Sequence, residues 1–125
     1  MKPKTTGLTH IIEALGYTAA GFKAAYKNEE AIRQEVVVFS ILIPAAFWVG
    51  RTPAEIVLLI GCCLIVFALE IMNAAVESVV DRIGLERHEL SGRAKDLASA
   101  AVYVTWANLV MTWLVIGIPR FFFTH

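Results

Sequence analysis

Residues 66–96 read VFALEIMNAAVESVVDRIGLERHELSGRAKD, which combines an apolar helical pattern with regularly spaced polar side chains. These polar residues are Glu70, Asn73, Glu77 and Asp81. At about 100° per residue they fall within an arc of roughly 80° on one helix face. Ionisable groups at membrane depth cost about 2.5–3.5 kcal/mol each on insertion scales, so they are candidates for function. Hydrogen bonding between helices is the alternative, but a run of acids that leads into a mixed-charge loop favours function.

The composition indicates a membrane protein. Of the 125 residues 58% are hydrophobic, and the mean hydropathy is +0.65. A soluble domain has about 45–50% apolar residues. The length predicts a single domain, residues 1–125. A net charge of zero argues against nucleic acid as a partner, because no basic excess is available to neutralise phosphates. Adjacent Cys62 and Cys63 are expected to be apolar filler, since helix neighbours point apart.

The apolar segments predict an all-α integral membrane protein. Three transmembrane helices are expected at about residues 35–50, 56–81 and 93–121, with residues 82–92 as the loop between the last two. From about residue 5 to 34, apolar residues recur every three or four positions and charges lie mostly elsewhere. This pattern is typical of an amphipathic helix on the membrane surface.

Basic residues predict the orientation of the chain. Five Lys or Arg residues precede the first span and four lie at 82–95, whereas only Arg51 lies between the first and second spans. The positive-inside rule therefore places the N-terminus and the 82–92 loop in the cytoplasm. Ser91 is expected to cap the third membrane helix near residue 93.

The polar residues at this interface suit a magnesium–nucleotide site, because Mg²⁺ prefers one or two carboxylates together with phosphate oxygens. Glu29 and Glu77 could hold the metal, and Lys95 could meet a phosphate. Glu70 lies deeper in the apolar zone and could act as the base. The chain has neither G-x-x-x-x-G-K-[ST] nor G-x-G-x-x-G. A membrane enzyme and a small transporter or channel subunit both stay open, with the cluster favouring the enzyme.

Two long segments, Glu70–Gly84 and His88–Asp96, resemble the prokaryotic integral-membrane diacylglycerol kinase family. Shorter matching segments are Thr5–Gly7, Ala14–Tyr17, Asn28–Glu29 and Arg33–Glu35. The resemblance implies a homotrimer of three-span subunits, each with a surface helix, in the bacterial inner membrane. It also implies Mg²⁺-dependent transfer of the ATP γ-phosphate to diacylglycerol, which gives phosphatidic acid. A related branch phosphorylates undecaprenol; the HELSGRAKD segment resembles the diacylglycerol branch more closely.

The resemblance also implies residue roles. Glu70 matches the catalytic base, with Asn73 orienting it and Lys95 assisting, while Glu29 and Glu77 match the metal ligands. Positions that match nucleotide contacts are His10, Tyr17, Glu29, Glu77, Glu86, His88, Lys95 and Asp96. Positions that match the lipid site are Ala14, Arg33, Gln34, Glu35, Trp48, Glu70, Ser99 and Trp113.

Three positions depart from the family pattern. His10 stands where an arginine is common, Glu13 where a lysine is usual, and Ile56 where an arginine can occur. Each change removes a positive charge, so weaker nucleotide affinity or an altered lipid preference is expected. Because three spans cannot enclose both a lipid and a nucleotide, we expect sites shared between subunits, with Glu29 of one chain meeting Glu77 of another.

Overall fold

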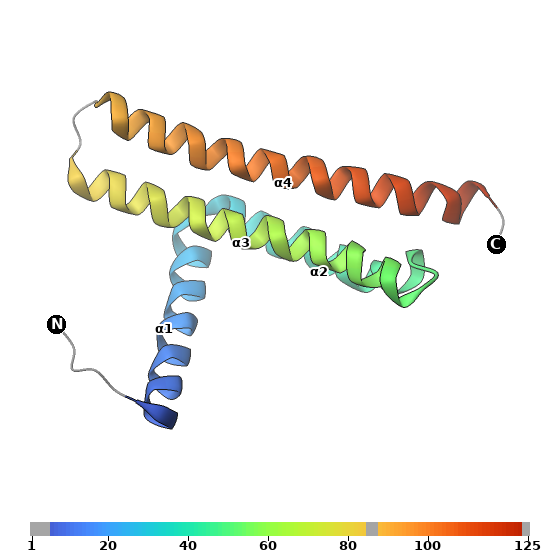
Figure 1. The fold of residues 1–125 in the computed structure, drawn as a ribbon, viewed down its shortest axis with the longest axis horizontal. Helices are drawn as coiled ribbons and strands as arrows, with labels where there is room; N and C mark the ends of the chain where they lie inside the picture. The colour runs from blue at the N-terminus through green and yellow to red at the C-terminus, as the bar shows by residue number, and fades with distance from the viewer. Residues whose placement is uncertain (1–5, 85–87, 124–125) are drawn as a thin grey trace.

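The computed structural model describes residues 6–84 and 88–123, and its regular structure there is entirely helical. The helices are α1 (Gly7–Asn28), α2 (Glu30–Val49), α3 (Pro53–Ile83) and α4 (Glu89–Phe122). α3 and α4 run antiparallel side by side, α2 packs along α3, and α1 projects crosswise from this bundle (Figure 1). α2, α3 and α4 are each long and apolar enough to cross a membrane, which confirms the predicted all-α fold with three helices of spanning length.

The first helix ends earlier than the sequence predicted. Instead of continuing to about residue 34, the helix breaks at Glu29, whose φ of −116° and ψ of 113° are extended. Arg33 Nη1 donates hydrogen bonds to the carbonyl oxygens of Tyr26 and Lys27 at 2.8 and 3.0 Å. Carbonyls in the last turn of a helix lack partners within it, so Arg33 stabilises the end of α1. The first membrane helix consequently begins at residue 30 rather than 35.

The other two membrane helices also begin earlier than expected. α4 begins before residue 93 because His88, rather than Ser91, caps it: His88 Nδ1 accepts a hydrogen bond from the Leu90 amide at 3.1 Å. α3 begins at Pro53, before residue 56, and the side chain of Thr52 caps it. Proline suits the first turn of a helix because its missing N–H would have had no partner there.

The main hydrophobic core joins all three membrane helices. Its buried members are Phe39 on α2, Cys62, Cys63 and Val66 on α3, and Leu109 on α4. Both cysteines are free and buried, in agreement with their predicted role as apolar filler. This core fixes α2 against the α3–α4 pair at mid-height.

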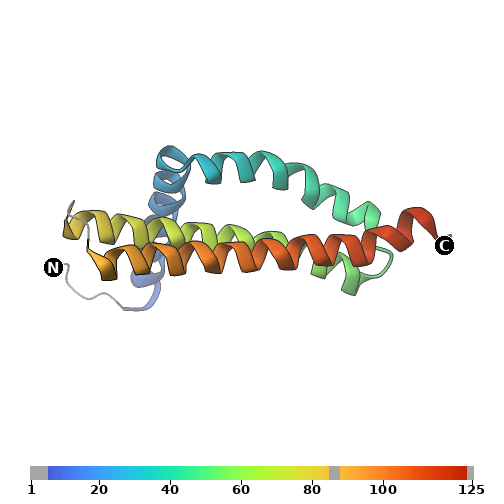
Figure 2. The same cartoon turned by 90° about the horizontal axis from the view of Figure 1, so that it is seen from above.

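A cluster near the C-terminus fastens the end of α2 to α4. Arg120 Nε donates to the carbonyl oxygen of Trp48 at 3.2 Å, and the guanidinium lies 5.5 Å from the centroid of the indole ring. Phe121 meets the same ring edge-on at 5.1 Å. From this end α2 diverges from the α3–α4 pair toward α1 (Figure 2). The divergence separates the helices at the end of the bundle where the acids of α3 lie.

Candidate active site

A cavity of about 470 Å³ lies between α2, α3 and α4 near the start of α2. It is lined by Glu29, Ala31, Gln34, Glu35, Val38, Glu70, Asn73, Glu77, Ser99, Val102, Tyr103 and Trp106. Seven of these twelve residues were predicted from the sequence as site residues. Four elements supply them, because the α1–α2 junction adds Glu29 to the three membrane helices.

An ion pair near this cavity indicates the register of α4 against α3. Lys95 Nζ lies 2.8 Å from Asp81 Oδ1. Antiparallel helices rise equally per residue, so positions equally far from the pair lie at equal depth. Ser99 and Glu77, each four positions away, both line the cavity, about 6 Å along the helix axis from the pair.

The same register continues deeper into the bundle. Tyr103 is level with Asn73, and Trp106 is level with Glu70. Glu70 therefore lies about 16 Å along the helix axis from the Lys95–Asp81 pair, at about 1.5 Å per residue. The cavity thus extends from near the Lys95–Asp81 ion pair to the aromatic side chains of Tyr103 and Trp106.

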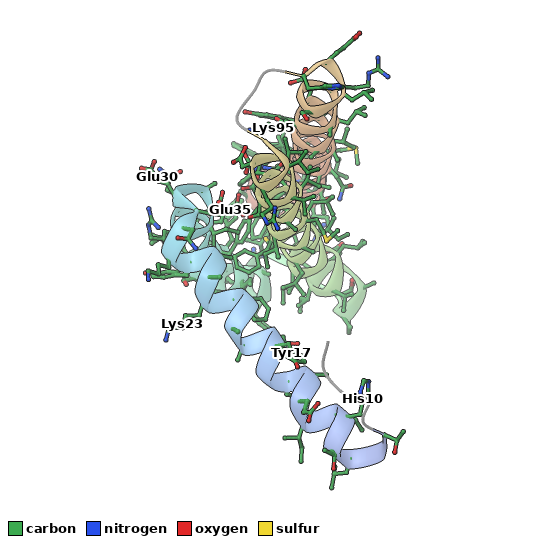
Figure 3. The ribbon with its side chains drawn as sticks, turned by 90° about the vertical axis from the view of Figure 1, so that its left-hand side faces the viewer. His10, Tyr17, Lys23, Glu30, Glu35 and Lys95 are labelled. Carbon is green, nitrogen blue, oxygen red and sulfur yellow. The ribbon has the colours of Figure 1, made fainter. Side chains whose placement is uncertain are left out.

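Glu35 and Glu70 form a carboxyl pair in the deep part of the cavity. Glu35 is 5% exposed and lies on the side of α2 that faces α3 and α4 (Figure 3). Its carboxyl lies within hydrogen-bonding distance of the Glu70 carboxyl. Within residues 6–84 and 88–123, Glu35 Oε1 has no hydrogen-bond partner. Both carboxyl groups therefore border the same space between the helices.

Glu29 and Glu77 form a second pair of acids, which lies nearer the Lys95–Asp81 ion pair than Glu35 and Glu70 do. Burial and the negative charge of Glu77 raise the pKa of Glu29, and the positive charge of Arg33 opposes this rise. Glu29 and Glu77 of one chain line the same cavity, and the expected pairing of Glu29 with Glu77 of another subunit stays a prediction. Glu29 lies at the break between α1 and α2 and lines the cavity together with residues of α3.

This second pair fits a divalent cation that also binds phosphate. The described part of the chain contains no cluster of three or more His, Cys, Asp or Glu side chains that could enclose a metal. Mg²⁺ usually takes one or two carboxylates and completes its shell with waters and substrate phosphates. Asn73 Nδ2 donates to Glu77 Oε1 at 3.4 Å, and its expected role of orienting Glu70 stays a prediction.

Several predicted site residues lie outside the cavity. His10, Ala14 and Tyr17 are on α1, and Figure 3 shows His10 and Tyr17 well away from Glu35 and Lys95. Trp48 lies at the opposite end of α2, against Arg120. Within one chain, these residues do not meet the acids of α3.

The remaining predicted residues have other surroundings. His88 caps α4, while Asp96 lines a separate hollow at the start of that helix. Trp113 packs against the core, and its indole Nε1 is buried with no hydrogen-bond partner among the residues described. Glu86 lies outside the described residues.

Sequence reasoning missed Tyr103 and Trp106, which form much of the α4 wall. Ser99, Tyr103 and Trp106 are spaced four and three positions apart, as neighbours on one helix face are. That spacing, extended from the predicted Ser99, is the signal that could have identified them.

Comparisons with known proteins match the chain to one family. The model of a family described as prokaryotic diacylglycerol kinase matches residues 16–117. A diacylglycerol kinase of Haemophilus influenzae is 54% identical over 110 residues, which cover 88% of this chain and 93% of the relative. One from Escherichia coli K12 is 47% identical over 116 residues, covering 93% and 95%. One from Pseudomonas aeruginosa is 45% identical over 111 residues, covering 89% and 90%.

Proposed function

We propose that this chain, which belongs to the prokaryotic diacylglycerol kinase family, transfers the γ-phosphate of ATP to the hydroxyl of diacylglycerol. The products are phosphatidic acid and ADP. The observation that carries the proposal is the single cavity that joins the Glu29–Glu77 pair to the deeper Glu35–Glu70 pair. Such a cavity lets a soluble nucleotide meet a lipid that stays in the bilayer.

Glu70 is proposed as the general base. As the lipid hydroxyl oxygen attacks the γ-phosphorus, Glu70 accepts the hydroxyl proton, and the bond from the γ-phosphorus to the bridging oxygen of ADP breaks. Glu35, within hydrogen-bonding distance of Glu70, holds the carboxyl in place and lends it a second site for the proton. Gln34 and Ser99 add polar contacts for the glycerol group.

Glu29 and Glu77 are proposed to hold Mg²⁺ with the nucleotide, and Asn73 positions Glu77. When bound, the ion neutralises charge on the β- and γ-phosphates. Lys95 is proposed to meet a phosphate at the entrance by exchanging its ion pair with Asp81 for the nucleotide.

We further propose a homotrimer in the bacterial inner membrane, with the N-terminus in the cytoplasm and α1 on the membrane surface. Leu8, Ile11, Leu15 and Phe22 leave more than half of each side chain exposed on α1, a stretch that lipid or a neighbouring subunit would cover. In the trimer, His10 and Tyr17 would reach the nucleotide of a neighbouring subunit, since within one chain α1 carries them away from the cavity.

The proposal is tested by transfer of labelled phosphate from ATP in mixed micelles, with diacylglycerol and undecaprenol offered separately. Glu70→Gln should lower kcat by about 10²–10⁴-fold, as loss of a general base does. Glu55→Gln is the matched control, because Glu55 lies on α3 but pairs with Arg51 outside the cavity. Transfer to undecaprenol alone would identify the sister activity. No transfer by the folded protein would refute a kinase and favour a transporter.

A mixing experiment tests the origin of the metal pair. Chains carrying Glu29→Gln are assembled with chains carrying Glu77→Gln. Since one chain brings both carboxylates to the same cavity, the mixture should stay as inactive as either variant. Recovery of activity on mixing would show that the pair forms between subunits.

A further inference from the structure

Two aromatic residues of α4 lie where the acidic cavity meets an apolar groove. Tyr103 and Trp106 line the cavity, and both also line a groove of about 640 Å³ along α4. The other residues of this groove are Ala107, Val110, Met111, Leu114 and Val115. The groove has no charged side chain along it, whereas the cavity contains four glutamates. Tyr103 and Trp106 therefore mark the change from a polar to an apolar environment.

The two side chains are held differently. The Trp106 ring packs against Phe39 of the core at 5.9 Å between centroids, which fixes it at the level of Glu70. The Tyr103 side chain is 71% exposed, at the level of Asn73. Tyrosine and tryptophan each combine an apolar ring with a polar tip, so both suit a lipid whose head is polar and whose chain is not.

Resting on the proposed function, we propose that Tyr103 and Trp106 position the acceptor lipid where its ester-linked glycerol joins an acyl chain. The Tyr103 hydroxyl donates a hydrogen bond to an ester carbonyl of the acceptor. Trp106 packs against the first methylene groups, and the chain continues along the groove toward Val110 and Met111. These two are thus positioning residues that select a glycerol ester over an acceptor without ester groups.

The occupant follows from the two residues, Tyr103 and Trp106, that line both spaces. A ligand whose hydroxyl reaches Glu70 from the side of the groove would lie beside Trp106, because both residues line the same cavity and Trp106 also lines the groove. Beyond Trp106, the wall that this cavity shares with the groove is apolar and runs along a membrane-spanning helix. An acyl chain attached to the reacting glycerol matches this order of polar head, ester and hydrocarbon. A polyprenol offers hydrocarbon directly after its hydroxyl and leaves Tyr103 without an acceptor.

Tyr103→Phe removes only the hydroxyl and should preserve the fold. For dioctanoylglycerol, KM should rise about two- to tenfold, as expected for one lost hydrogen bond. The kcat value and the KM for ATP should stay unchanged. The matched control Tyr26→Phe removes the same atom from a residue that lines a different groove, and it should change none of these values.

The hydrogen bond itself is tested with 1,2-di-O-octylglycerol, an acceptor in which ether oxygens replace the esters. If Tyr103 binds an ester carbonyl, the wild-type protein and Tyr103→Phe should have equal KM for the ether. The ether lacks the carbonyl and the variant lacks the hydroxyl, so each change removes the same hydrogen bond. An equal rise in KM for ester and ether acceptors would overturn the assignment. Failure of the wild-type protein to phosphorylate either acceptor would instead refute the proposed function.

Trp106→Leu tests the path of the chain. In the wild-type protein, KM should fall as the acyl chains lengthen from six to eight carbons, by at most about fourfold for each buried methylene. The variant should flatten this dependence while the KM for ATP stays constant. Phe47→Leu, an exposed aromatic on α2 outside the cavity, is the control and should keep the wild-type dependence. An unchanged dependence in Trp106→Leu would show that the acyl chain does not pass this residue.

Discussion

Replacing Arg33 with methionine should loosen the junction between α1 and α2 and thereby displace Glu29. The Arg33 guanidinium donates to the carbonyl oxygens of Tyr26 and Lys27 at 2.8 and 3.0 Å. Hydrogen bonds to a charged group contribute about 1.5–3 kcal/mol each, and water competes for both at this exposed position. We therefore expect a net loss of about 1–2 kcal/mol, equivalent to a shift of roughly 5–30-fold toward an opened junction.

The hydrogen-exchange rates of backbone amides at the junction measure this local opening directly. The Glu29 amide donates to the Ala25 carbonyl at 2.9 Å, and its protection should fall by about 5–30-fold in Arg33→Met. Because Glu29 is a proposed metal ligand, the KM for Mg–ATP should rise while the KM for diacylglycerol stays constant. Arg93→Met is the control, since Arg93 loses only an exposed pair with Glu89 at 3.7 Å.

The family resemblance instead implies that Arg33 lines the lipid site, and the same variant separates the two roles. If protection at the junction is unchanged and the KM for diacylglycerol rises, Arg33 contacts lipid and does not stabilise the end of α1. Arg33→Lys refines the comparison, because a lysine keeps the charge but presents a single compact ammonium to the two carbonyls.

Three further predictions follow from individual contacts. Asn73→Ala should raise the Mg²⁺ concentration for half-maximal activity by about 10–100-fold, because the hydrogen bond to Glu77 is lost, while kcat at saturating Mg²⁺ should change little. A lower kcat with unchanged Mg²⁺ dependence would show that Asn73 orients the general base instead. Burial and the charge of Glu77 raise the pKa of Glu29, so ionisation of Glu29 destabilises the metal-free fold as the pH rises through that raised pKa. Above this pKa, Glu29→Gln should therefore unfold at a higher temperature than the wild-type protein. The difference in unfolding temperature should vanish below about pH 4, where Glu29 is protonated in both the folded and the unfolded state. Gly50→Ala should lower the free energy of unfolding by about 1–3 kcal/mol, because its Cβ would lie 3.0 Å from the Ala46 oxygen and the Ile56 nitrogen. Gly61→Ala should raise it by about 0.5–1 kcal/mol, because its Cβ would meet no described atom beyond its own helix backbone and chain neighbours within 4 Å. Equal denaturation midpoints of the two variants in detergent would contradict the packing of the α2–α3 turn.

Hydropathy predicted the three membrane helices because their apolar windows are long, whereas the break at Glu29 could not be read in this way. Neither glycine nor proline lies between residues 28 and 35, and charged residues continue across the break. What stabilises it is a contact from Arg33 back to carbonyls six and seven positions earlier. Such a contact depends on the bend that it stabilises, so a periodic pattern in the sequence carries no sign of it.

The acidic face of α3 was predictable because helical periodicity alone groups Glu70, Asn73 and Glu77. Their partners on α4 required the register between two helices. An aromatic in an apolar span is ordinarily a core or lipid-facing residue, so Trp106 stands out only through its spacing from Ser99 and Tyr103 on one helix face. The Lys95–Asp81 pair indicates this register, because counting from it along both helices shows which residue of α4 is level with a given residue of α3.

This register also explains how a membrane bundle tolerates so many acids. Polar groups within a bilayer are tolerated when they face a cavity or one another rather than lipid. Glu35 and Glu70 do both: each lines the cavity, and each lies within hydrogen-bonding distance of the other. Because Trp106 is level with Glu70, the deepest acid is also where the cavity reaches the apolar groove. A carboxyl group kept there by its partner lies where a lipid hydroxyl can arrive without leaving the bilayer, and this placement connects the fold to the proposed chemistry.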